Sequence, residues 1–141
     1  MKSVLLLLLT ICAAQAAPVV SEIEWRSACD GATIDVVADG GRTMSVRAKA
    51  IHSAVVIEWT IHYLDGHPVS AEFRESERGR VTEGENAGDY TGVDRLKRLK
   101  TFKWQGERFL IEDKALREEL EDILTKVQTA RDKGPSPKSS D

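Results

Sequence analysis

The stretch VVIEWTIHYLDGHPVSAEFRESER, which runs from Val55 to Arg78, decides the fold because it predicts two neighbouring antiparallel strands. Apolar side chains occupy odd positions on both sides of Asp65-Gly66, with polar side chains between them. This alternation is typical of strands that bury one face. The two buried faces coincide if the connecting loop has an odd number of residues, so we predict a three-residue turn from Asp65 to His67.

The odd loop fixes the register of this hairpin. It sets apolar side chains opposite one another on the buried face and a favourable charge pair on the other face. The predicted partners are Trp59 with Phe73, Ile61 with Ala71, Tyr63 with Val69, and Glu58 with Arg74.

Three titratable side chains, His62, Asp65 and His67, gather around this turn and raise the question of a catalytic or metal site. A zinc site needs three or four converging ligands, and a nucleophilic site needs a serine or cysteine beside an oriented histidine. The sequence specifies neither arrangement, and an aspartate next to glycine is ordinary turn chemistry. We therefore predict no catalytic residue, no metal and no cofactor here, and place His62 on the solvent side near Ser70.

Two further hairpins follow the same logic. Asp39-Gly40-Gly41 suits a three-residue turn, and Gly106-Glu107 suits a two-residue type II′ turn. The predicted partners are Val36 with Met44, Ile34 with Val46, Trp104 with Phe109, and Phe102 with Ile111. Residues 19–29 are compatible with either a strand or a short helix.

The clearest element is a C-terminal helix from Asp113 to Lys133, whose apolar residues form one stripe. Asp113 is its expected N-cap, and Gly134-Pro135 ends it. Strands followed by one such helix predict an α+β fold, an antiparallel β-meander of about five or six strands packed against one C-terminal amphipathic α-helix. We expect four large side chains in its core: Trp59, Phe73, Trp104 and Leu120.

The N-terminus has the layout of a cleaved secretory signal peptide. Lys2 precedes a short apolar core with five consecutive leucines, and alanines follow it. Cleavage after Ala16 leaves a single domain over 17–133 and a disordered tail over 134–141, with no transmembrane segment in the mature chain. We expect a periplasmic or secreted protein in which Cys29, the only cysteine after cleavage, is either a buried small side chain or an exposed thiol able to pair with a partner.

The net charge argues against two classes of partner. Without the leader the chain carries 19 basic and 23 acidic residues, a net charge of about −4. This argues against general binding to nucleic acid or to anionic membranes, and for solubility.

The segment from Ser76 to Asp94 has four glycines and few apolar residues, and it predicts a long loop. A concentration of basic residues follows it. Loops and charged flanks often bind partners, so we select as candidate partner-binding residues Glu83, Glu85, Asp89, Tyr90, Arg95, Lys97 and Arg98. Alternatively, the loop is only mobile and the lysines guard a sheet edge against aggregation. Leu96 and Leu99 fit either a helical turn or the beginning of a strand.

Two functions remain, since function must be argued from a site. The first is a small exported, non-catalytic binding or interaction protein of the bacterial cell envelope, with a protein or an anionic envelope polymer as partner. The second is a small hydrolase that uses His62, His67 and nearby carboxylates. The lack of a nucleophile motif favours the first.

Overall fold

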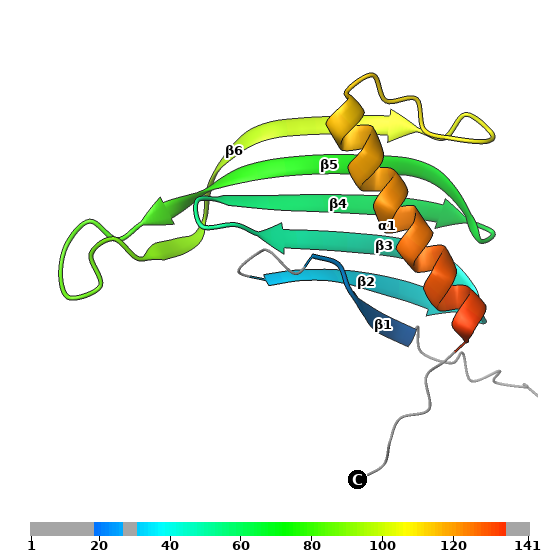
Figure 1. Cartoon of the computed structure of the whole chain (residues 1–141), viewed down its shortest axis with the longest axis horizontal. Coiled ribbons are helices and arrows are strands. Elements are labelled where there is room, and N and C mark those ends of the chain that lie inside the picture. Colours follow the sequence, from blue (N-terminus) through cyan, green and yellow to red (C-terminus); the bar gives the residue numbers. More distant parts are fainter. Residues whose placement is uncertain (1–18, 27–30, 135–141) are drawn as a thin grey trace, which may run out of the picture.

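The structure, a computed structural model, describes residues 19–26 and 31–134, which form one six-stranded sheet crossed by one helix (Figure 1). The elements are β1 (Val19–Glu24), β2 (Gly31–Asp39), β3 (Arg42–Ile51), β4 (Val55–Leu64), β5 (His67–Arg80), β6 (Tyr90–Lys103) and α1 (Lys114–Lys133). Each strand pairs antiparallel with the next one in the chain, so β1 and β6 are the two edges. The predicted α+β meander with one C-terminal helix is confirmed.

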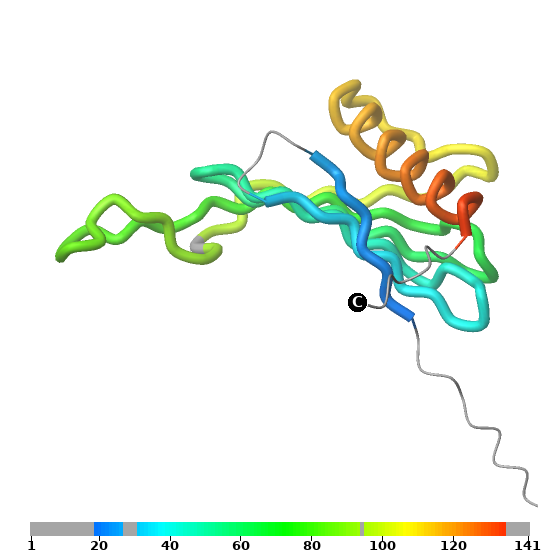
Figure 2. The backbone as a smooth tube through the Cα atoms, turned by 60° about the horizontal axis from the view of Figure 1, so that its bottom comes forward, coloured from blue at the N-terminus to red at the C-terminus, as the bar shows by residue number. Residues whose placement is uncertain are grey.

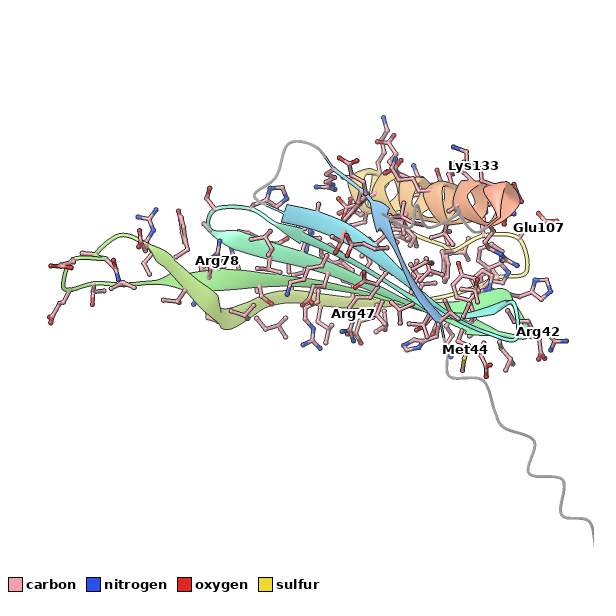
Figure 3. The ribbon with its side chains drawn as sticks, turned by 90° about the horizontal axis from the view of Figure 1, so that it is seen from below. Arg42, Met44, Arg47, Arg78, Glu107 and Lys133 are labelled. Atoms are coloured by element: carbon pink, nitrogen blue, oxygen red, sulfur yellow. The ribbon has the colours of Figure 1, made fainter. Side chains whose placement is uncertain are left out.

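The helix covers one face of the sheet, which we call the inner face (Figure 2). The other face, the outer face, carries mainly polar side chains; Figure 3 shows Met44 and Arg47 on it, on the side away from α1. Alternation along the strands produces this division, because successive side chains point to opposite faces. Within the described residues, no helix is long and apolar enough to cross a membrane.

Aromatic side chains form the centre of the core. Trp59 and Phe73 are fully buried neighbours with ring centroids 5.0 Å apart, and the ring of Phe102 lies 6.0 Å from that of Trp59. Leu120 of α1 is buried with them, as predicted. Trp104 differs from the prediction: it is only partly buried and packs at the rim of the core.

The helix begins and ends where the sequence predicts. The Asp113 carboxylate accepts a hydrogen bond from the Leu116 amide at 3.1 Å, which satisfies one of the free N–H groups of the first turn. Gly134 follows the last residue with a φ of 70°, a conformation that favours glycine.

Polar contacts also attach α1 to the sheet. Glu119 accepts a hydrogen bond at 2.6 Å from the indole Nε1 of Trp59 and forms an ion pair with Arg26, two residues beyond the end of β1. The guanidinium of Arg26 lies 4.5 Å from the ring centroid of Trp25. One carboxylate of the helix therefore joins the centre of the sheet to its N-terminal edge.

The middle of the β4–β5 hairpin has the predicted register, with Trp59 opposite Phe73, but its turn does not. The turn contains two residues, Asp65 and Gly66, both with positive φ (50° and 78°), as a type I′ turn requires. A bulge at Val69 then restores the parity that we had attributed to a three-residue loop. The predicted pairing of Tyr63 with Val69 is wrong, since Tyr63 pairs with Pro68.

The β2–β3 hairpin shows the same difference. Its turn contains only Gly40 and Gly41, and a bulge leaves Met44 without a partner in β2. The predicted pairs are therefore wrong by two residues, and the observed ones are Val36 with Val46 and Ile34 with Ala48. Two-residue I′ turns match the twist of the strands better than the loops we predicted.

The third hairpin is confirmed only at its turn. Trp104 pairs with Phe109 across a turn in which Gly106 has a φ of 88°. Phe102 pairs with Ala71 of β5 instead of Ile111, because beyond Phe109 the chain leaves for the start of α1. Of the ambiguous residues 19–29, the part from Val19 to Glu24 is a strand; Cys29 lies outside the described residues.

Candidate functional site

The predicted loop from Ser76 to Asp94 is in fact mostly strand. β5 and β6 are each 14 residues long and continue together beyond the other strands as a two-stranded ribbon (Figure 1). Only residues 81–89 connect them, in a turn where the Val81 amide donates to Asp89 O and the Gly88 amide to Val81 O, at 2.9 and 2.8 Å. The loop prediction is wrong because a ribbon that extends past the core has no buried face and so lacks the apolar alternation of a strand.

The acidic candidates lie at the tip of this ribbon. Glu83, Glu85 and Asp89 are exposed in the connecting turn. Among the described residues, no group of three or more histidine, cysteine, aspartate or glutamate side chains is arranged to hold a metal ion. Acidic side chains at this tip are therefore solvated charges with no shared ligand geometry.

Tyr90 is the first residue of β6 and lies between two arginines of β5. The guanidinium carbons of Arg78 and Arg80 are 5.2 and 4.5 Å from its ring centroid, and Arg80 donates a hydrogen bond to its hydroxyl. Arg78 also donates to the carbonyls of Thr91 and Ser53, at 3.0 and 3.3 Å. These contacts join the ribbon to the β3–β4 connection.

The basic candidates do not form one patch. Arg95 lies opposite Glu77 in the ladder and binds its carboxylate at 2.7 Å. Lys97 is exposed, at a bulge where no residue of β5 opposes it. The sequence located these charges correctly on one strand, but it could not show that the strand sends them in different directions.

Arg98 points to the inner face, where its role is structural. Its guanidinium lies 4.9 Å from the ring centroid of Phe73, binds Glu75 at 3.2 Å and comes within 3.8 Å of the N-cap carboxylate of Asp113. Its Nε is buried without a hydrogen-bond partner. Arg98 thus holds the start of α1 against β6.

An apolar stripe on β6, which sequence reasoning missed, lies on the outer face. It consists of Val93, Leu96 and Leu99, which are 56%, 49% and 47% exposed; we call it the outer stripe. Bulges leave Asp94 and Lys97 without partners in β5, so every third residue, instead of every second, returns to the same face. The i, i+3 spacing that suggested a helical turn is the signal of this bulged strand.

Cations surround the outer stripe. Its three members lie opposite Arg78, Ser76 and Arg74 of β5, in the order of the chain. Arg74 is exposed and makes only a 3.4 Å ion pair with Glu72, and Lys97 lies between Leu96 and Leu99 in the sequence. The outer face of β6 therefore carries an apolar line with Arg74 and Arg78 opposite it in β5 and Lys97 within the same strand.

The two histidines of the hydrolase hypothesis do not form a catalytic arrangement with each other. His62 lies on the outer face opposite Ser70, whereas His67 borders a groove beside α1. Within the described part of the chain, neither imidazole makes a hydrogen bond or ion pair with a carboxylate. A histidine base needs such a partner to orient it.

Comparisons of the chain with protein-family models, with curated proteins and with solved structures gave no match.

Proposed function

We propose that this chain is a small exported, non-catalytic binding protein of the bacterial cell envelope, periplasmic or secreted. The signal-like N-terminus supports export. The outer stripe supports binding: three large apolar side chains, each about half exposed, lie in one line on one face. Contiguous exposed apolar surface marks interaction sites more often than isolated residues do.

The partner is a protein segment that is partly apolar and acidic. Its apolar side chains cover the outer stripe, and burying one leucine fully stabilises a complex by about 1.5 to 3 kcal/mol before the costs of association. Its carboxylates meet Arg74, Arg78 and Lys97, which add steering and specificity.

Site-specific photo-crosslinking tests this function. A photoreactive residue replaces Leu96 in one variant and Met44 in another, and both proteins are exposed to native envelope extract. Met44 is the matched control because it is 47% exposed on the same face, far along the sheet from β6. We expect a protein adduct from position 96, absent from position 44.

Substitutions identify what the partner recognises. For this test the photoreactive residue is placed at position 93. Replacing Leu96 and Leu99 with serine should then abolish the protein adduct, whereas Met44→Ser should not. Lys97→Glu should weaken binding of the partner and reduce the salt dependence of that binding. We avoid charge reversal at Arg95 or Arg98, since it would set glutamate against Glu77 or Glu75 and disturb the fold.

Two outcomes would replace this proposal. Binding that survives the serine substitutions but falls steeply with salt would indicate an anionic envelope polymer. Ester hydrolysis lost in His67→Ala would indicate the hydrolase. Export itself is tested by intact mass, which should show a mature N-terminus at Ala17.

A further inference from the structure

A second surface of the molecule is an open groove between α1 and the β4–β5 turn, on the opposite face of the sheet from the outer stripe. Its volume is about 590 Å³, within the range of small-molecule sites. Residues of the turn form one wall, the C-terminal half of α1 forms the other, and Trp104 closes the end near β6. We call this the helix–turn groove.

Apolar surface lines most of the helix–turn groove. Tyr63 and Pro68 contribute from the hairpin, Leu124 and Val127 from the helix, and Trp104 from the end of β6. The rings of Trp104 and Phe109 pack edge to face at 5.1 Å, which fixes the indole at the rim. Rigid aromatic walls favour an apolar ligand body because little side-chain entropy is lost on binding.

The charge in the groove is positive. None of its eleven lining residues is acidic, although the chain as a whole has a net charge of −3, and Arg131 is the one arginine or lysine among them. Arg131 makes no ion pair with any residue that the structure describes. Its full charge exceeds the partial negative charge, roughly half a unit, at the end of the helix.

A hydrogen-bond donor lies beside this cation. Burial raises the pKa of the Tyr63 phenol above its ordinary value of 10.0, and the Arg131 guanidinium acts in the opposite direction. The phenol is therefore protonated at neutral pH. A guanidinium with a neighbouring phenol provides several N–H and O–H donors for one carboxylate.

We propose that the helix–turn groove binds an amphipathic monocarboxylate, with its carboxylate on Arg131 and its apolar body against Tyr63 and Trp104. This site is independent of the outer stripe, so either proposal can fail without the other.

Decanoate is the probe, titrated into the mature protein by isothermal calorimetry below its micelle-forming concentration. Trp104 gives a second readout, because a ligand on its ring changes its fluorescence; Trp104→Phe should remove most of that change. We expect decanoate to bind at least tenfold more tightly than decanol or decyltrimethylammonium. Equal binding of decanoate and decanol would overturn the proposal.

Two variants, one at Arg131 and one at Lys133, distinguish binding in the groove from nonspecific attraction to positive charge. Arg131→Gln should weaken decanoate binding about tenfold and leave decanol unchanged. Lys133→Gln, which removes the same charge from the same helix end outside the groove, should change neither. Equal effects of the two substitutions would show nonspecific attraction and overturn the assignment to Arg131.

A variant that fills the groove with a large side chain tests whether the ligand binds there. Gln128 lies on the exposed side of α1 and lines the groove, so Gln128→Trp should occupy the space while the helix stays folded. Circular dichroism confirms the fold, and decanoate binding should be lost. Unchanged affinity in a folded variant would mean that the ligand binds elsewhere.

Discussion

The carboxylate of Glu119 offers a sharp test of how α1 is attached to the sheet. It accepts a hydrogen bond from Trp59 at 2.6 Å and pairs with Arg26, and its side chain is only 15% exposed. Trp59 itself is fully buried, so its indole N–H has no route to solvent when the acceptor is removed. Glu119→Leu should therefore destabilise the fold.

The magnitude follows from the groups left unpaired. A hydrogen bond to a charged group contributes about 1.5 to 3 kcal/mol, and a buried donor without an acceptor costs about 1 to 3 kcal/mol. The Arg26 pair is partly exposed and adds about 1 kcal/mol or less. We expect Glu119→Leu to lose about 3 kcal/mol, and Glu119→Gln about 1 kcal/mol, because glutamine keeps an oxygen for Trp59.

A double-mutant cycle isolates the contact. Urea unfolding is followed by circular dichroism for Glu119→Leu, Trp59→Phe and the double variant, and phenylalanine keeps an aromatic ring while removing the donor. The coupling energy should be about 1.5 kcal/mol or more. A value within about 0.5 kcal/mol of zero, the range of independent sites, would refute the proposed contact.

Three other predictions concern stability. Leu120→Ala should cost about 2 to 5 kcal/mol and His62→Ala less than about 0.5 kcal/mol in urea unfolding, because one side chain is buried and the other exposed. Arg98→Lys keeps the charge but loses the planar contact with Phe73, so it should lower the unfolding free energy by about 1 kcal/mol. Folding raises the pKa of the Tyr63 phenol above 10.0, so the stability that the buried, protonated phenol contributes is present below pH 10 and is lost as the pH rises through the pKa of the folded state. Tyr63→Phe removes this titration and should therefore reduce the loss of stability above pH 10.

Parity and helix periodicity were enough to predict the architecture. The alternation in β4 and β5 identified Trp59 and Phe73 as core partners, and the stripe in α1 identified its buried face. Both patterns depend on burial, which the sequence records directly as the difference between apolar and polar side chains. The elements that pack on the core were therefore predictable.

Strand registers near the turns were not predictable, because two different arrangements of the turn produce the same pattern of odd and even apolar positions. An odd loop and a two-residue turn followed by a bulge bring the same side chains to the same face. At Gly40-Gly41 and Asp65-Gly66 the structure has the second arrangement. The bulged residues, Met44 and Val69, are exposed apolar side chains that an odd loop would have placed in a ladder.

The candidate site was located on the right strand but with the wrong contacts. The sequence selected Arg95 and Arg98 as candidate partner-binding residues, yet both form ion pairs with cross-strand residues, Glu77 and Glu75. A correct register for β5 and β6 would have shown these pairs, but the three irregularities in that ladder interrupt the alternation from which a register is predicted.

The bulges of β6 also decide how a partner is held. An edge strand normally offers its free N–H and C=O groups to another strand, and bulges and lysines on the edge oppose that pairing. In β6 the bulges at Asp94 and Lys97 interrupt any regular ladder with an incoming strand, while the same bulges turn Val93, Leu96 and Leu99 outward. The strand is thus closed to edge addition where its side chains are most exposed. A partner at this site contacts the outer face of β6 by side-chain packing, so the serine substitutions in the outer stripe should affect binding more than changes in backbone hydrogen bonding along the edge.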